Sequence, residues 1–326
     1  MKFLKNLAAA AAAMSFAVAP ALAQTVGGYP NKPVRVIVPF PAGQATDIIG
    51  RLVAQKLGDK WGQPLVIDNR VGAGGITGAD AAAKSAPDGY TLLVAGSGPL
   101  SILPAINSSL PYAPMRDFQP LGLVASMPML MVSAPTFEAK TVQELIALAR
   151  AKPGDLSYAS SGTGSTGQLA AELFISRTQT KIVHVPYKGS GMALTDVIGG
   201  RVPFTVESQA AILPLANRLR IIAVTGAKRS LKYPDVPTLA ESGLPNFDVV
   251  AWIGLVGPAN MPPAIVKKIS EDLAAIVATK EVQDRIAELG LEAAPLNAEQ
   301  FGPFIKSEID KFTAIAKTAN IKAEPN

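Results

Sequence analysis

Short apolar runs of strand length alternate with segments of helical periodicity along most of the chain. This alternation is typical of α/β proteins, in which helices cover a largely parallel sheet. The expected strands are Val34–Pro39, Leu65–Asp68, Tyr90–Ala95, Leu121–Ala125, Met129–Ser133, Ser157–Ser160, Ile182–Val185, Phe204–Val206, Ile221–Thr225 and Val249–Val256. The expected helices are Asp47–Leu57, Thr141–Ala151, Gln168–Arg177, Met192–Gly199, Pro263–Ala278, Glu281–Leu289 and Asn297–Ala319, the last with Asn297 as N-cap and Gln300 three residues on.

One unit recurs in this pattern: a strand ends in a loop of Gly, Ser, Thr or Pro, and a helix begins. Val34–Phe40 leads into Pro41–Thr46, and Leu156–Ser160 leads into Ser161–Gly167. A third such unit includes His184–Gly191. These units place their loops at the carboxyl ends of parallel strands, where open α/β sheets bind ligands.

The length of 326 residues predicts about two domains. Because the first two units lie far apart in the sequence, we expect two α/β domains that face each other across a cleft. Domain 1 is expected to comprise residues 24–124 plus 251–326, and domain 2 residues 125–250. The chain is expected to cross between them in Leu121–Met131 and Ala251–Pro258, and the helices after Pro262 to pack on domain 1.

Residues 1–23 have the pattern of an export signal peptide. Lys2 and Lys5 precede the apolar stretch Leu7–Pro20, and Ala21-Leu22-Ala23 forms a small-x-small cleavage site before Gln24. The apolar stretch is too short to span a bilayer. We therefore expect a soluble mature chain outside the inner membrane.

The composition excludes several classes of chemistry. The chain has no cysteine and one histidine, which excludes thiolate nucleophiles, disulfides and multi-histidine metal sites. We therefore predict no metal and no cofactor. Without Lys2 and Lys5 the net charge falls from +5 to +3, with no block of like charge, so we expect no binding to nucleic acid.

Gly162–Gly167 matches the G-x-G-x-x-G pattern of dinucleotide-binding loops. Such a site also needs an acidic residue about 20 positions on, whereas the next strand ends in Val185–Lys188 without an acid. A glycine turn followed by a Ser or Thr helix cap explains the loop without a ligand. The functional alternative that we favour is capture of an anion by the free N–H groups of the helix N-terminus.

Hydrolytic chemistry finds little support in the sequence. Ser97, Ser161, Ser165 and Ser190 lie among glycines, but none of them lies in a G-x-S-x-G motif. The single histidine, His184, lies inside an apolar strand, where a partly buried structural role is expected. We predict no catalytic residue.

Two interpretations of Asp47 remain open. It is an acid in the first turn of a helix, where the helix dipole favours a negative charge. It could equally accept a hydrogen bond from a hydroxyl or ammonium group of a ligand.

Taken together, several segments resemble the Bug-type periplasmic solute receptors of tripartite tricarboxylate transporters. The resemblance covers essentially the whole mature chain, through Tyr29–Gly43 with Asp47 and Arg51, Asp68–Gly75, Pro87–Leu93, Tyr158–Ser165, Val185–Gly189, Leu219–Thr225 and Pro234–Thr238. It implies a two-domain Venus-flytrap receptor that binds a small carboxylated molecule in the periplasm and delivers it to a membrane permease. It also implies that the protein is not an enzyme, and we expect a monomer.

The resemblance places ligand contacts on two loops, with two further positions near the cleft. The implied contacts are Phe40, Pro41, Ala42, Gly43, Gln44 and Asp47 from the first loop, Ser160, Gly162, Thr163, Gly164, Ser165 and Thr166 from the second, and Tyr187 and Glu207. Gln44 replaces a glycine and Gln168 a histidine that are usual in the family, so the ligand cannot be transferred from relatives.

The residues and the resemblance agree at the helix N-termini. Each terminus carries about half a positive charge and unpaired N–H donors, so two of them facing one cavity could hold a carboxylate without an arginine. Two other functions remain open: a periplasmic ligand sensor for a membrane signalling partner, and a secreted α/β enzyme.

Overall fold

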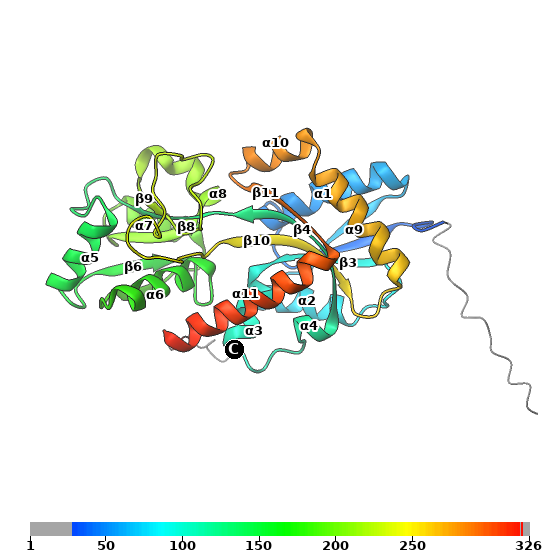
Figure 1. Ribbon diagram of the computed structural model, residues 1–326, viewed down its shortest axis with the longest axis horizontal. Coiled ribbons are helices and arrows are strands. Elements are labelled where there is room, and N and C mark those ends of the chain that lie inside the picture. The colour runs from blue at the N-terminus through cyan, green and yellow to red at the C-terminus, as the bar shows by residue number, and fades with distance from the viewer. Residues whose placement is uncertain (1–27, 320, 322–326) are drawn as a thin grey trace, which may run out of the picture.

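The computed structural model describes residues 28–319 and residue 321 (Figure 1). The predicted signal peptide, residues 1–23, lies outside the described residues. The described chain forms two α/β lobes, each built on its own sheet, as the sequence predicted. Among the described residues, no helix combines the length and the apolar character needed to cross a bilayer.

The first lobe contains the sheet with strand order β11-β4-β10-β3-β1-β2. Its strands are β1 (Val34–Val38), β2 (Leu65–Asn69), β3 (Thr91–Gly96), β4 (Phe118–Met127), β10 (Ala251–Pro258) and β11 (Glu292–Asn297). β1 pairs in parallel with β2 and β3, whereas β10 is antiparallel to β3 and β4. The loops that follow β1, β2 and β3 therefore lie at one edge of this sheet.

The second lobe contains the sheet with strand order β7-β6-β8-β5-β9. Its strands are β5 (Met129–Ser133), β6 (Ser157–Ser160), β7 (Val183–Pro186), β8 (Phe204–Ser208) and β9 (Arg220–Val224). β6 is parallel to β7 and β8, so the loops after these three strands also share one edge.

The structure contains every strand that the sequence predicted and adds β11. This strand escaped prediction because it carries Pro295 and two small alanines, lies at the sheet edge, and is interrupted by a bulge between Ala293 and Leu296.

The helices also include all those predicted. Their bounds are α1 (Ala45–Trp61), α2 (Ile76–Ala83), α3 (Leu103–Ile106), α4 (Pro114–Asp117), α5 (Val142–Ala151), α6 (Thr166–Thr178), α7 (Ser190–Ile198), α8 (Gln209–Ile212), α9 (Pro263–Val277), α10 (Lys280–Glu288) and α11 (Ala298–Thr318), with short turns η1 (Ala73–Gly75), η2 (Gly98–Ile102) and η3 (Leu213–Arg218). The predicted cap of the last helix is confirmed, because Asn297 and Gln300 form a reciprocal capping box. The helices that were not predicted are short, so they show little apolar periodicity.

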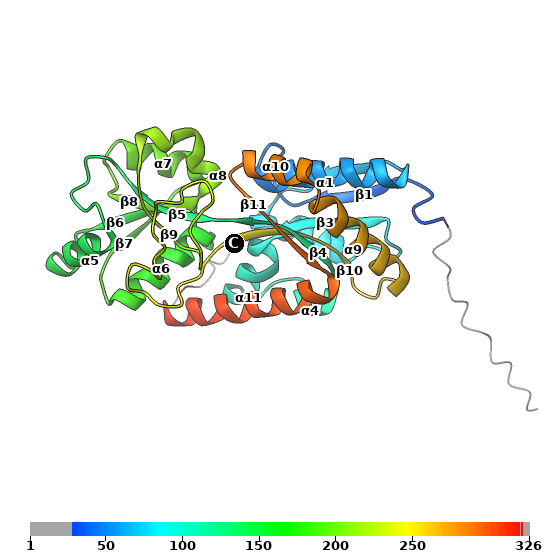
Figure 2. The ribbon, with the colours of Figure 1, turned by 45° about the horizontal axis from the view of Figure 1, so that its top comes forward.

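The chain passes from the first sheet to the second between β4 and β5 and returns at β10. β4 stays in the first sheet through Met127, beyond the expected end of the first segment at residue 124. Helix α11 departs further from expectation, because it packs on both lobes (Figures 1 and 2). Phe301 and Ile305 belong to a core of the first lobe, whereas Phe312 and Ile315 belong to the core of the second.

Candidate ligand-binding site

The loop edges of the two sheets enclose a cavity of about 970 Å³. This volume lies at the upper end of the range for small-molecule sites. The loops of the first lobe contribute Phe40, Gly43, Gln44, Ala45, Thr46, Gly74, Ser97 and Gly98. Those of the second contribute Ser161, Gly162, Thr163, Gly164, Ser165, Thr166, Gly189, Ser190 and Gly191. The cavity therefore lies where the strand–loop–helix units predicted a ligand.

The N-terminus of α1 presents backbone donors to this cavity. Its N-cap, Gln44, is extended and makes no side-chain cap, and the hydrogen bond from Ile48 N to Gln44 O closes the first turn. The amides of Ala45 and Thr46 precede that bond and have no acceptor within the helix. Gly43 has a φ of +86°, a value that favours glycine. This terminus can thus donate to an anion directly.

Asp47 lies behind the same loop and does not line the cavity. Its carboxylate accepts hydrogen bonds from Gly43 N at 2.9 Å, from Asn69 Nδ2 at 2.8 Å and from Arg51 Nε at 2.9 Å. Burial alone would raise the pKa of Asp47, but the hydrogen bonds from Arg51, Asn69 and Gly43 outweigh it and lower the pKa to about 2. Asp47 is therefore an ionised anchor for the Gly43 loop.

The N-terminus of α6 carries the second loop. Ser165 caps the helix by accepting from Gln168 N at 3.2 Å. Behind the loop, Gln168 Oε1 accepts from Gly164 N at 2.7 Å, and Ser160 Oγ accepts from Gly162 N at 3.2 Å. Ser160 is completely buried, so it shapes the loop rather than facing the cavity.

His184 joins these two supports. Its Nε2 lies 2.6 Å from Ser160 Oγ, and Gln168 Nε2 lies 3.3 Å from its Nδ1. Its ring stacks on Tyr158 with centroids 4.9 Å apart, and burial lowers the pKa of the imidazole. A neutral imidazole that accepts from Gln168 at Nδ1 and donates to Ser160 at Nε2 satisfies all three groups. The half-buried structural histidine expected from the sequence is found, and it holds the second loop.

The N-terminus of α7 is a third source of donors, which the sequence-based site did not include. Its N-cap is Gly189, with φ +115° and no side-chain cap. Ser190 Oγ donates to Glu207 Oε2 at 2.8 Å, and burial raises the pKa of Glu207. Glu207 therefore supports Ser190 without lining the cavity itself. The hydroxyl of Tyr187 donates a hydrogen bond to Asp196 at 2.8 Å.

The structure thus divides the residues proposed from the sequence into two groups. Those that line the cavity are Phe40, Gly43, Gln44, Gly162, Thr163, Gly164, Ser165 and Thr166. Those that lie outside the lining are Pro41, Ala42, Asp47, Ser160, Tyr187 and Glu207. Lining residues absent from the proposal include Gly74, Ser97, Gly98, Gly189–Gly191 and Trp252. The rule that loops follow parallel strands at one edge could have found all of these except Trp252.

The two lobes meet at the cavity as well as at the crossing strands. Ser97 Oγ lies 3.4 Å from Thr166 Oγ1. Ser97 directly precedes η2 in one lobe, and Thr166 is the first residue of α6 in the other. Within residues 28–319 and residue 321, no cluster of three His, Cys, Asp or Glu side chains is arranged as metal ligands.

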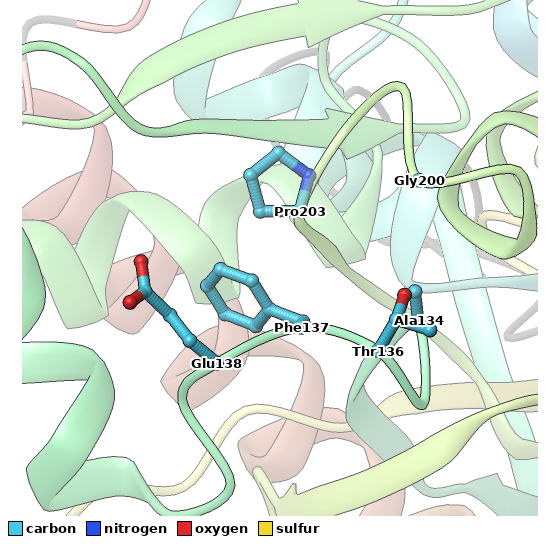
Figure 3. Close-up of a pocket in the computed structure, with 6 residues that line it drawn as sticks. All are labelled: Ala134, Thr136, Phe137, Glu138, Gly200 and Pro203. Carbon is cyan, nitrogen blue, oxygen red and sulfur yellow. The ribbon is translucent and has the colours of Figure 1, made fainter.

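A smaller hollow of about 310 Å³ lies at the opposite edge of the second sheet (Figure 3). It is lined by Ala134, Thr136, Phe137, Glu138, Gly200 and Pro203. These residues follow β5 and precede β8, at the ends of these strands that lie away from Ser208.

Comparison with known proteins agrees with this geometry. Residues 49–321 match the family model described as the tripartite tricarboxylate transporter family receptor. Protein BugT of Bordetella pertussis (strain Tohama I) is 36% identical over 307 residues, which cover 93% of each chain. Rpa4515 of R. palustris, solved with adipate, superposes with a TM-score of 0.81 at 34% identity and covers 90% of this chain and 99% of its own. MatC of Rhodopseudomonas palustris, solved with malate, superposes with a TM-score of 0.75 at 29% identity. The match covers 88% of this chain and 99% of the MatC chain. The chain therefore belongs to the tripartite tricarboxylate transporter receptor family, whose members are solute-binding receptors.

Proposed function

We propose that the protein binds a small carboxylated organic solute between its lobes in the periplasm and delivers it to a membrane permease. The observation that carries the proposal is the convergence of three helix N-termini, those of α1, α6 and α7, on one cavity. Each terminus offers about half a positive charge together with unpaired N–H groups. Together they can neutralise a carboxylate without a cationic side chain.

Two further observations support a receptor rather than an enzyme. Ser160 and His184 form the contact that most resembles a nucleophile and its base, but Ser160 is completely buried and bonds to the loop backbone. The solved relatives hold adipate and malate, both carboxylates. We therefore propose binding and release, without a chemical step, for this chain.

Two tryptophan substitutions test where the solute binds. The protein is purified from the periplasm without added ligand, denatured, and its released small molecules are identified by mass spectrometry. Thr163→Trp places an indole in the large cavity, and Thr136→Trp, also at an exposed position, places one in the smaller hollow. We expect an organic acid from the wild type and from Thr136→Trp, and none from Thr163→Trp.

The same two variants test delivery of the solute to a permease. Cells that lack the receptor should regain uptake of that acid with the wild type and with Thr136→Trp, but not with Thr163→Trp. Release of the acid from Thr163→Trp at the wild-type level would contradict the proposed site. Normal uptake without any receptor would contradict the proposed delivery.

A further inference from the structure

The lining of the large cavity includes two chemically different surfaces. One is the set of helix N-termini and glycine loops described above. The other, which we call the apolar wall, consists of Ala210, Ala211, Leu213, Pro214, Leu289 and Leu291. The wall comes from α8 and η3 in the second lobe and from the end of α10 and the turn into β11 in the first.

Close contact between the lobes fixes the apolar wall in place. Gln209 Nε2 donates to Gly290 O at 2.9 Å in a buried position. A Cβ atom at Gly290 would lie 3.3 Å from Ala210 Cα, so the two backbones approach closely. Both ribbon views show α8 beside α10 (Figures 1 and 2). The apolar wall is therefore a fixed part of the cavity lining, held by contacts between the two lobes.

The charge near the wall is unsuited to a second acid group. Among the lining residues, all within the described part of the chain, Glu288 is the single charged side chain. Glu288 also forms an exposed ion pair with Arg285 on α10, in which Arg285 Nη1 lies 2.6 Å from Glu288 Oε2. A second carboxylate that lay against the apolar wall would thus meet either apolar carbon without a hydrogen-bond partner or the negative charge of Glu288.

We propose that the ligand is a monocarboxylate with an apolar body, whose acid group is held by the helix N-termini and whose hydrocarbon part lies against the apolar wall. This proposal rests on the proposed function and narrows it. It departs from di- and tricarboxylate binding because the site provides one pole for an anion and a hydrocarbon surface for the rest. Each methylene buried against the wall should raise affinity by about fourfold.

Hexanoate, adipate and hexanamide test this proposal, because they share a six-carbon chain and differ only at its ends. Their affinities are measured by calorimetry on the mature protein. We expect hexanoate to bind at least about tenfold more tightly than adipate, since adipate must desolvate an unpaired carboxylate. Adipate binding as tightly as hexanoate would overturn the monocarboxylate assignment alone.

Hexanamide separates this inference from the proposed function. It should bind at least about tenfold more weakly than hexanoate, because it lacks the charge that the N-termini favour. Equal binding of hexanamide and hexanoate would instead refute carboxylate recognition itself and leave the apolar wall intact. Loss of binding for all three would count against both claims.

A cationic side chain added to the apolar wall should reverse the preference for hexanoate over adipate. Leu213 is half-buried, so Leu213→Arg can direct its guanidinium into the cavity, and Leu213→Met is the matched apolar control. We expect Leu213→Arg to raise the affinity for adipate by about tenfold and to lower that for hexanoate, while Leu213→Met keeps the wild-type ratio. If Leu213→Arg fails to fold by circular dichroism, Leu289→Lys tests the other side of the wall. A folded cationic variant that keeps the wild-type ratio would overturn the proposal.

Discussion

At the scale of single residues, the site depends on side chains that do not line the cavity. The side chains of Asp47, Ser160 and Gln168 are buried, and each accepts a hydrogen bond from a backbone amide of one of the two loops. The sequence identified Asp47 and Ser160 as important but could not distinguish support from contact. That distinction depends on which way a side chain points, which residue spacing does not determine.

Asp47 provides a pH-dependent prediction. Its pKa is about 2, below the ordinary value of 3.8, so it contributes stability that is present above pH 3.8 and is lost as the pH falls toward 2. At pH 7 we expect Asp47→Asn to lower the free energy of unfolding by about 2 kcal/mol, because the amide group would face donors. Asp284→Asn, which alters an exposed pair with Lys280, is the control and should change stability little. Urea unfolding at pH 7 measures both; equal stability of Asp47→Asn and wild type would contradict the anchoring role.

His184 gives a second prediction, in which stability again falls as the pH decreases, but in a higher pH range than for Asp47. Burial lowers its pKa, so the folded protein binds the proton less well than the unfolded chain. Stability should fall as the pH drops below 6.5 toward the lowered pKa of His184. Protonation would also place an N–H at Nδ1 against the amide of Gln168. His184→Gln should remove this part of the pH dependence, and parallel unfolding curves for the two proteins between pH 7 and pH 5 would argue against it.

At the scale of elements, the recurrent strand–loop–helix unit predicted where the site lies. It gave the loops of α1 and α6 directly, and the same unit at His184–Gly191 pointed to α7. The apolar wall could not be predicted in this way, because α8 and η3 are too short to show periodicity. Its partner residues lie at the end of α10, and only the tertiary fold brings the two together.

Gly43 tests whether the loop of α1 contacts the ligand. A Cβ at Gly43 meets no atom within 4 Å, and its φ is +86°; Gly154 has the same freedom, with φ +88°, in a loop that does not line the cavity. Gly43→Val and Gly154→Val should therefore lose similar stability, about 1–2 kcal/mol each from backbone strain. Only Gly43→Val should abolish binding in calorimetric titrations. Loss of binding in both variants, or in neither, would contradict a direct role for this loop.

At the scale of the whole molecule, helix α11 joins the cores of both lobes. The sequence placed it on domain 1, because an amphipathic helix shows which face is apolar but not how many partners that face has. Its second half carries Phe312 and Ile315 into the core of the second lobe. The division into residues 24–124 plus 251–326 and residues 125–250 stays a prediction.

This linkage predicts coupled unfolding of the two lobes. The wild type should unfold in a single calorimetric transition, whereas Phe312→Ala should lose about 3–5 kcal/mol and separate the transitions. Leu145→Ala removes a buried side chain from α5 in the same core, and should lower stability without separating them. Two transitions in the wild type, or a single one in Phe312→Ala, would show that α11 does not couple the lobes.

The central claim is that three helix N-termini hold a carboxylate between the lobes without a cationic side chain. A crystal structure of the protein with the acid that copurifies with it tests this most directly. We predict that one carboxylate of the ligand lies within hydrogen-bond distance of backbone N–H groups at the starts of α1, α6 and α7, with no Arg or Lys contact. A carboxylate bound by an arginine or lysine, or bound in the hollow beside Phe137, would contradict it.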